Sequence, residues 1–191
     1  MPCALATPRA RPLTTVNPDA GYRGITAFLV ERGTPGFSIG KKEDKLGIRA
    51  SSTCELVLED CEVPADNVLG DVGIGYKIAI ETLNEGRIGI GAQMAGLARG
   101  ALDHALAYAR QRKQFGKLIG EFQVLQHRAA HLYGEIEIAR AAALKSAQLL
   151  DAGDDQAELF VSVAKAKAGR VSALAVQEGV QMHGGIGMTD E

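Results

Sequence analysis

The sequence contains no tryptophan, and aromatic residues make up only 5% of its 191 residues. Its formal net charge of −2 gives no support for a general nucleic-acid-binding surface. No apolar run approaches the roughly 18 residues that a membrane span needs. The three cysteines, Cys3, Cys54 and Cys61, are an odd number without metal-ligand spacing, which favours reduced thiols in an intracellular setting. We therefore expect neither a nucleic-acid nor a membrane partner.

The sequence contains two long helical patterns joined by a basic loop. Apolar residues recur at alternating spacings of four and three, which predicts that one face of each helix is buried in a bundle-like seam. The first stripe comprises Tyr76, Ile80, Leu83, Arg87, Ile90, Met94, Leu97, Ala101, His104 and Tyr108. The second comprises Leu125, Ala129, Leu132, Ile136, Ala139, Ala143, Ser146 and Leu150. A third helix is predicted over residues 156–183, ending at the cluster Gly184-Gly185-Ile186-Gly187.

Short strands are predicted before the first helix. Apolar runs indicate strands over residues 25–30, 37–39 and 55–59, with a fourth if residues 46–49 pair as well. So few strands form a small sheet at best, which suggests part of a β-domain. We predict a loose segment over residues 1–19, a partial β-domain over 20–70, and a helical domain over 71–191. The fold class is mainly α with a small β part, and three helices leave one groove of a four-helix bundle open.

Arg87 is a charged residue inside the first predicted stripe. A buried guanidinium costs several kcal/mol unless it is paired. One interpretation is an ion pair, with Glu85 or with a carboxylate on another helix. The other is that the polar head of a ligand reaches this helix, and spacing alone leaves both open.

The loop Arg112-Lys113-Gln114-Phe115-Gly116-Lys117 gathers positive charge beside a glycine, which suits a phosphate. Taken alone, a solvated loop between helices explains it better. Gly73-Ile74-Gly75 lacks the full phosphate-binding fingerprint, and the cluster at Gly184 follows a helix, which indicates a C-cap. His127, His131 and Glu135 have a spacing that can bind a metal, but a solvated helix face is the favoured interpretation.

Together, six stretches resemble the acyl-CoA dehydrogenase family, in the order seen there. The β part contributes Gly21-Tyr22-Arg23-Gly24-Ile25-Thr26-Ala27-Phe28-Leu29-Val30, Lys45-Leu46-Gly47-Ile48-Arg49-Ala50-Ser51-Ser52-Thr53 and Val63-Pro64-Ala65-Asp66-Asn67-Val68-Leu69-Gly70. The helical part contributes Leu83-Asn84-Glu85-Gly86-Arg87-Ile88, Arg112-Lys113-Gln114-Phe115-Gly116-Lys117 and Gln181-Met182-His183-Gly184-Gly185-Ile186-Gly187. The Asn-Glu-Gly-Arg variant is most similar to the short/branched-chain members.

The resemblance implies a middle β-domain followed by a C-terminal four-helix bundle, and α,β-dehydrogenation of an acyl-CoA thioester with FAD as hydride acceptor. It implies electron-transfer flavoprotein as electron acceptor and assembly as a homotetramer. The location would be the cytoplasm in a bacterium or the mitochondrial matrix in a eukaryote. Substrate-binding residues carried over by motif are Tyr76, Asn84, Glu85, Gly86 and Arg87. Cofactor-binding residues are Arg112, Phe115, Gln123, Gln181, Met182, His183, Gly184 and Gly185, of which 181–185 would hold the adenosine end of FAD from a neighbouring subunit.

The sequence also departs from the family pattern. The N-terminal helical domain and the Trp-containing flavin segment are absent, and the usual catalytic glutamate would lie beyond Glu191. Some members place this glutamate immediately before the arginine, where this chain has Gly86. We therefore assign no catalytic residue. The alternatives are a non-catalytic helical oligomerisation fragment, or a flavin-dependent oxidase or monooxygenase of the same fold.

Overall fold

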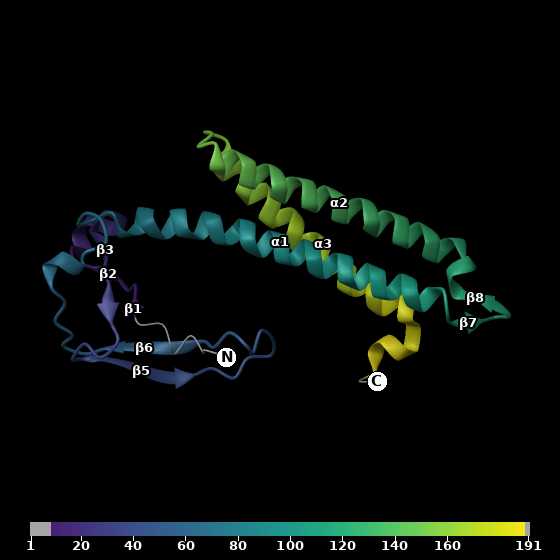
Figure 1. Cartoon of the computed structure of the whole chain (residues 1–191), viewed down its shortest axis with the longest axis horizontal. Coiled ribbons are helices and arrows are strands. Elements are labelled where there is room, and N and C mark those ends of the chain that lie inside the picture. Colours follow the sequence, from purple (N-terminus) through teal and green to yellow (C-terminus); the bar gives the residue numbers. More distant parts are fainter. Residues whose placement is uncertain (1–8, 190–191) are drawn as a thin grey trace. The chain divides into compact units, whose positions relative to one another are not determined.

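The computed structural model describes residues 9–189. Contacts divide the chain into two units, Met1–Glu81 and Thr82–Glu191. Helix α1 (Gly75–Ala109) begins in the first unit and continues through the second (Figure 1). No helix in the described part of the chain is long and apolar enough to cross a membrane. The predicted fold class, mainly α with a small β part, is confirmed.

Short antiparallel strand pairs form the first unit. Strand β1 (Arg9–Ala10) pairs with β4 (Val30–Glu31), and β2 (Leu13–Thr15) pairs with β3 (Ile25–Ala27). The longest pair joins β5 (Phe37–Lys42) to β6 (Cys54–Leu58). The predicted strands at 37–39 and 55–59 are therefore confirmed, with small shifts of their ends. Cys54 and Cys61 are free thiols, and Cys3 lies outside the described residues.

Three sequence expectations about this unit are corrected. The strand predicted over residues 25–30 is broken into β3 and β4, because Phe28 between them bridges to Val68 instead. Residues 46–49 form no strand: Leu46 is 99% exposed and Ile48 has a φ of 52°. Within the segment 1–19, expected to be loose, residues 9–15 contain β1 and β2. Each of these strands is only two or three residues long. Such a strand is too short to show an alternation of apolar and polar residues in the sequence, and it is held by hydrogen bonds to its partner strand.

The stretch before α1 packs on the strands rather than acting as a simple linker. The Leu69 N–H donates to the Ala27 carbonyl at 2.8 Å, and the Gly73 N–H donates to Oγ1 of the fully buried Thr26 at 3.0 Å. A Cβ on Gly75 would lie 2.7 Å from the Thr26 carbonyl carbon. Gly73 and Gly75 thus allow close approach of backbone, which explains this glycine cluster without a phosphate.

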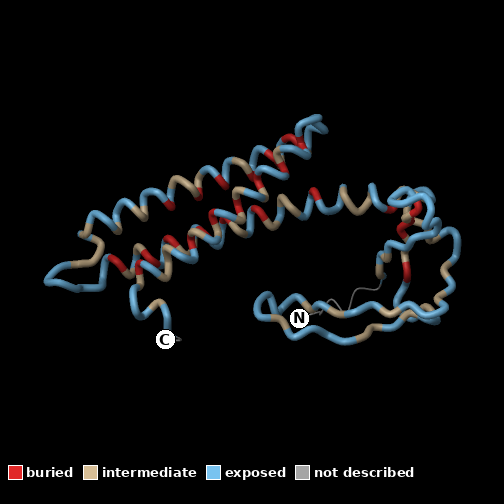
Figure 2. Tube along the Cα trace, turned by 180° about the vertical axis from the view of Figure 1, so that it is seen from behind, coloured by how far each residue is buried: buried red, intermediate tan, exposed pale blue. Residues whose placement is uncertain are grey.

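The second unit packs α1 with α2 (Gln123–Asp151) and α3 (Ala157–His183), which η5 (Gly184–Met188) follows. Helices α2 and α3 lie against each other along their lengths (Figure 1). Buried positions recur along all three helices (Figure 2). The central cluster mixes large and small side chains: Ala98, Leu102, Leu132, Ile136, Ala139, Val171 and Ala175. Small residues leave room for the large ones, as a close-packed interior requires.

The predicted stripe is confirmed on α2 and wrong by one residue on α1. Helix α2 buries Leu132, Ile136, Ala139, Ala143 and Ser146 as predicted, with Leu149 in place of Leu150. Helix α1 of the second unit buries Asn84, Gly91, Ala95, Ala98, Leu102, Ala105 and Ala109. Each of these follows a predicted position by one, a rotation of about 100°. The predicted stripe and the buried stripe of α1 have the same spacing. The prediction chose the stripe with the larger apolar residues, whereas the structure buries the neighbouring stripe of mostly smaller ones.

Two leucines of α1 test this register. We expect Leu102→Ala to lower the free energy of unfolding by about 2–5 kcal/mol, because Leu102 is 1% exposed and its loss leaves a cavity. Leu97→Ala should change it by less than about 0.5 kcal/mol, because Leu97 is 55% exposed. Chemical denaturation of both variants measures the difference. Equal losses would contradict the observed register.

Candidate functional site

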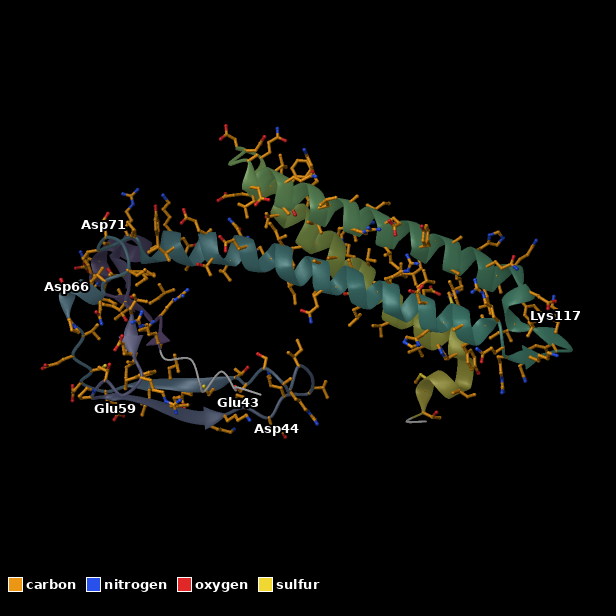
Figure 3. All side chains as sticks on the ribbon, viewed as in Figure 1. Glu43, Asp44, Glu59, Asp66, Asp71 and Lys117 are labelled. Carbon is orange, nitrogen blue, oxygen red and sulfur yellow. The ribbon has the colours of Figure 1, made fainter. Side chains whose placement is uncertain are left out.

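The basic loop forms a tight hairpin. Strand β7 (Lys113–Gln114) pairs with β8 (Lys117–Leu118), which leaves Phe115 and Gly116 as a two-residue turn. Figure 3 labels Lys117 on this hairpin. Both turn residues have positive φ, 55° for Phe115 and 79° for Gly116, as the type I′ turn requires. The sequence analysis favoured a solvated loop between helices here; the loop is exposed, and the structure adds that it is an ordered hairpin with an aromatic residue at a turn position that favours asparagine or glycine.

Phe115 is strained and exposed at the same time. A bulky residue at positive φ costs about 1–3 kcal/mol, and such residues persist mainly where function maintains them. The Phe115 side chain is 92% exposed, and its ring meets the Phe122 ring edge-on at a centroid distance of 6.2 Å. Lys117 Nζ lies 4.2 Å from the centroid of the Phe122 ring. The hairpin therefore presents aromatic surface beside positive charge.

A cavity of about 540 Å³ joins this hairpin to the end of α3. It brings together two motifs that are far apart in the sequence. The predicted cofactor residues that line it are Arg112, Phe115, Gln181, Met182, His183, Gly184 and Gly185. Lining residues that the sequence analysis missed include Tyr108, Ile119, Phe122, Leu125 and Ile186. Tyr108 lies one helical turn before Arg112, so its spacing could have indicated it.

The end of α3 shapes one wall of this cavity. Gly184 has a φ of 66°, and its N–H reaches the carbonyls of Val180 and Gln181. The predicted C-cap is thereby confirmed, because this conformation ends the helix and favours glycine. His183 stacks on Tyr108 at a centroid distance of 4.5 Å, and its Nδ1 lies 2.7 Å from the Gly179 carbonyl. The stack fixes the imidazole in place.

Gln123 is not among the residues that line the cavity, although its neighbours Phe122 and Val124 are. It is the exposed first residue of α2. The cavity thus holds a guanidinium, aromatic faces and a glycine turn within one site. This combination suits a ligand with a flat ring and an anionic group.

Arg87 lies in a different part of the second unit. It is half-buried rather than inside the buried stripe, a correction that follows from the rotated register of α1. One guanidinium nitrogen donates to Asn84 Oδ1 at 3.0 Å, and Asn84 Nδ2 donates to Glu158 Oε1 at 3.5 Å. An ion pair of Arg87, with Glu85 or with a carboxylate on another helix, was one of the two interpretations left open, and none is found among the described residues. Glu85 is exposed, and a Cβ on Gly86 would meet no atom within 4 Å.

Tyr76 belongs to the first unit, where its ring lies 5.5 Å from the ring of Tyr22 and its side chain is 45% exposed. The other predicted substrate residues, Asn84 to Arg87, belong to the second. The assignment of all five to a substrate site stays a prediction.

The metal-binding spacing of His127, His131 and Glu135 on α2 is not matched by a metal-binding arrangement of the described side chains. The described residues contain no group of three His, Cys, Asp or Glu side chains placed to hold a metal ion. Glu135 instead accepts a hydrogen bond from Lys167 Nζ of α3 at 2.6 Å. This hydrogen bond lowers the pKa of Glu135 below its ordinary value, against the opposing effect of desolvation.

Comparison with known proteins matches residues 73–191 to the acyl-CoA dehydrogenase C-terminal domain and residues 4–61 to the middle domain. The chain belongs to the acyl-CoA dehydrogenase family. This confirms the resemblance seen in the sequence. The predicted boundaries at residues 19 and 70 stay predictions.

Individual relatives agree with this family. The mitochondrial short/branched chain specific acyl-CoA dehydrogenase of Rattus norvegicus is 49% identical over 176 residues, which cover 92% of this chain and 40% of that protein. Butyryl-CoA dehydrogenase from Megasphaera elsdenii superposes with a TM-score of 0.92 and 42% identity, over 96% of this chain and 48% of its own. PigA, solved with FAD and proline, superposes with a TM-score of 0.90 and 28% identity, over 96% and 48%. The chain thus spans less than half the length of these relatives.

The Glu135–Lys167 pair predicts that the stability of the protein depends on pH. Because the folded-state pKa of Glu135 is lowered, its stabilisation is present above the unfolded pKa and is lost as the pH falls through the folded value. We expect Lys167→Gln to lower the Tm at pH 7 and to have a progressively smaller effect below about pH 4. The exposed Lys145→Gln is the matched control. A Tm difference that stays constant down to pH 2 would contradict this role.

The strain at Phe115 is testable by two substitutions that both remove the ring. Phe115→Asn creates the Asn-Gly sequence that type I′ turns favour, whereas Phe115→Ala retains a residue poorly suited to positive φ. We expect the Asn variant to exceed the Ala variant by about 1 kcal/mol in free energy of unfolding, measured by urea denaturation. Equal stabilities would show that the turn is not strained.

Proposed function

We propose that this chain takes part in FAD-dependent α,β-dehydrogenation of an acyl-CoA thioester, with a short or branched acyl group. The observation that carries the proposal is the cavity shared by the basic hairpin and the end of α3. Family membership supports the reaction type, and the rat and Megasphaera relatives support the acyl class by their names. The name of the rat relative also supports a mitochondrial location if the organism is a eukaryote.

The residues of the cavity fit the adenosine diphosphate end of FAD. Arg112 can bind the diphosphate through paired N–H groups. The apolar side chains of Ile119, Leu125 and Ile186 can cover a flat base. The glycine turn at Gly184 and Gly185 lets a ligand approach the backbone without a side chain in between. When bound, FAD would supply the acceptor for hydride from the thioester.

The substrate assignment rests on the helix segment around Arg87. Asn84 orients the guanidinium, so Arg87 can present its remaining N–H groups to a polar part of the thioester. Tyr76, Glu85 and Gly86 complete the proposed segment. Among the described residues we assign no base for the α-proton, since no carboxylate is placed beside an identified reaction centre.

Electron-transfer flavoprotein is the proposed electron acceptor, and a homotetramer the proposed assembly, both by family analogy. Leu83 of α1 and Leu144 of α2 are each more than half exposed, which supports burial against further protein. The same observation favours the second candidate, a helical oligomerisation module without catalysis. A flavin-dependent oxidase or monooxygenase is the remaining alternative, and the oxidase is supported by the fold shared with the prolyl acyl carrier protein oxidase AnaB.

Binding of ADP tests the cofactor site in the chain itself. ADP at 100 times its dissociation constant should stabilise the protein by about 2.7 kcal/mol. We expect Arg112→Gln to weaken binding by about tenfold or more, because a charge-assisted contact is lost. Arg110→Gln is the matched control, since Arg110 is an exposed neighbour that does not line the cavity.

Dehydrogenation is measured on protein reconstituted with FAD. A short or branched acyl-CoA should bleach the flavin absorbance under anaerobic conditions. Equal ADP binding by Arg112→Gln and Arg110→Gln would contradict the cofactor site. Flavin that binds but is not reduced by any acyl-CoA would contradict the reaction and favour the alternative without catalysis.

A further inference from the structure

Tyr108, in the last turn of α1, contacts both of the motifs that meet at the cavity. Its main-chain carbonyl accepts the N–H of Arg112 at 2.9 Å, and its ring stacks on His183 at an interplanar angle of 25°. Figure 1 shows the ends of α1 and α3 side by side at this point. The sequence analysis placed Tyr108 in a core-facing stripe and gave it no part in the site.

The main-chain contact of Tyr108 fixes Arg112. The N–H groups of Gln111 and Arg112 both reach the Tyr108 carbonyl, at 3.0 and 2.9 Å, where the helix ends. The Arg112 carbonyl in turn accepts the Ile119 N–H at 2.9 Å. Arg112 is therefore held to the end of α1 on one side and to the returning chain of the hairpin on the other. This contact uses the main chain alone, so it persists when the Tyr108 side chain is changed.

The side-chain contact of Tyr108 fixes His183, the last residue of α3. His183 Nδ1 lies 2.7 Å from the Gly179 carbonyl, and because a carbonyl can only accept, Nδ1 carries the hydrogen. The Tyr108 ring covers one face of the same imidazole at a centroid distance of 4.5 Å. A Cβ on Gly187 would lie 3.1 Å from the His183 Cβ, so η5 folds back closely on this residue. The imidazole and the glycine turn that follows it are therefore held together.

Tyr108 is not a core residue. The buried stripe of α1 passes through Leu102, Ala105 and Ala109, and Tyr108 lies beside it, half-buried. The central cluster of the bundle does not include it. Among the described residues 9–189, its hydroxyl makes no hydrogen bond. The ring therefore forms part of the cavity wall and not of the bundle interior.

A diphosphate site needs its two walls at a fixed separation. Arg112 supplies paired donors, and the turn at Gly184 supplies open backbone, and both must reach the same ligand. Binding groups have to be held within about 0.5 Å of the productive geometry by the packing of supporting residues. Tyr108 touches both walls, one through its carbonyl and the other through its ring. It is therefore placed to align them.

We propose that Tyr108 is a positioning residue of the cofactor site, and that its ring acts through His183 to hold the glycine turn against Arg112. This role rests on the proposed function, because the ligand is taken to be the adenosine diphosphate end of FAD. The alignment of two motifs from different helices is thereby assigned to one aromatic stack. Removal of the ring leaves Arg112 and the glycine turn in the protein but misaligned.

Calorimetric titration of the whole chain with ADP tests this role. We expect Tyr108→Leu to weaken ADP binding by about threefold to tenfold, because a stacked aromatic pair contributes about that much beyond its buried area. Tyr108→Phe retains the stack and should bind as the unsubstituted protein does. Tyr133→Leu, at an exposed tyrosine of α2 that does not line the cavity, is the matched control. The double variant Tyr108→Leu/His183→Leu should lose no more affinity than His183→Leu alone, because the two residues act as a unit.

Nuclear magnetic resonance detects the stack without any ligand. The ring current of Tyr108 should move the ring-proton signals of His183 upfield, and His183→Leu identifies these signals among the four histidines. Tyr108→Leu should lose this shift, whereas Tyr108→Phe should keep it. Melting without ligand checks that every variant folds, and Tyr108→Met is a second variant without the ring if the leucine variant does not fold.

The contrary results separate the positioning role from the cofactor site. Full ADP affinity in Tyr108→Leu overturns the positioning role and leaves the cofactor site, which Arg112→Gln tests separately. A loss in Tyr108→Phe as large as in Tyr108→Leu also overturns the role, because the hydroxyl would then act on the ligand directly. An unshifted His183 signal in the unsubstituted protein overturns it as well. If the unsubstituted protein binds no ADP, the cofactor site fails, and the role of Tyr108 fails with it.

Discussion

The packing of α2 against α3 is the constraint on which the second unit depends. Small residues such as Ala139 and Ala168 lie buried along these helices, and the Glu135–Lys167 pair joins their half-buried edges. Because two rigid helices are fixed in register, the end of α3 is fixed as well. The cavity beside the hairpin follows from that, since His183 can stack on Tyr108 only if α3 ends at the level where α1 ends. Packing far from the ligand thus sets the geometry of the site.

The cations on the surface of the second unit are of two kinds, those paired with carboxylates and those without such a partner. Cations such as Arg99 and Arg128 are neutralised by acids on neighbouring turns or helices, and they contribute modestly to stability. Arg112, which lines the cavity, has no such partner among the described ion pairs. Uncompensated charges beside a cavity cost little in water but become valuable when a phosphate arrives. The cofactor site that we propose at Arg112 thus depends on the distribution of ion pairs and not on the net charge.

Membership of a family and possession of an activity are separate matters here. Relatives of this fold include a dehydrogenase for butyryl-CoA and a protein solved with FAD and proline, so the same fold accommodates different ligands. The residues that would distinguish these chemistries are few. The strained Phe115 is one position where the backbone adopts a conformation that packing does not demand.

The sequence by itself determined the helical pattern, the stripe on α2, the end of α3 at Gly184 and the family, because these depend on local spacing and on motifs. It also singled out Arg112 and the stretch from Gln181 to Gly185. Only the tertiary structure decided that these two motifs share a cavity, since nearly 70 residues separate them. It also decided the register of α1, where two stripes of equal spacing compete and the space available beside α2 and α3 selects the smaller side chains. The very short strands arise from pairing between distant segments, which no local pattern encodes.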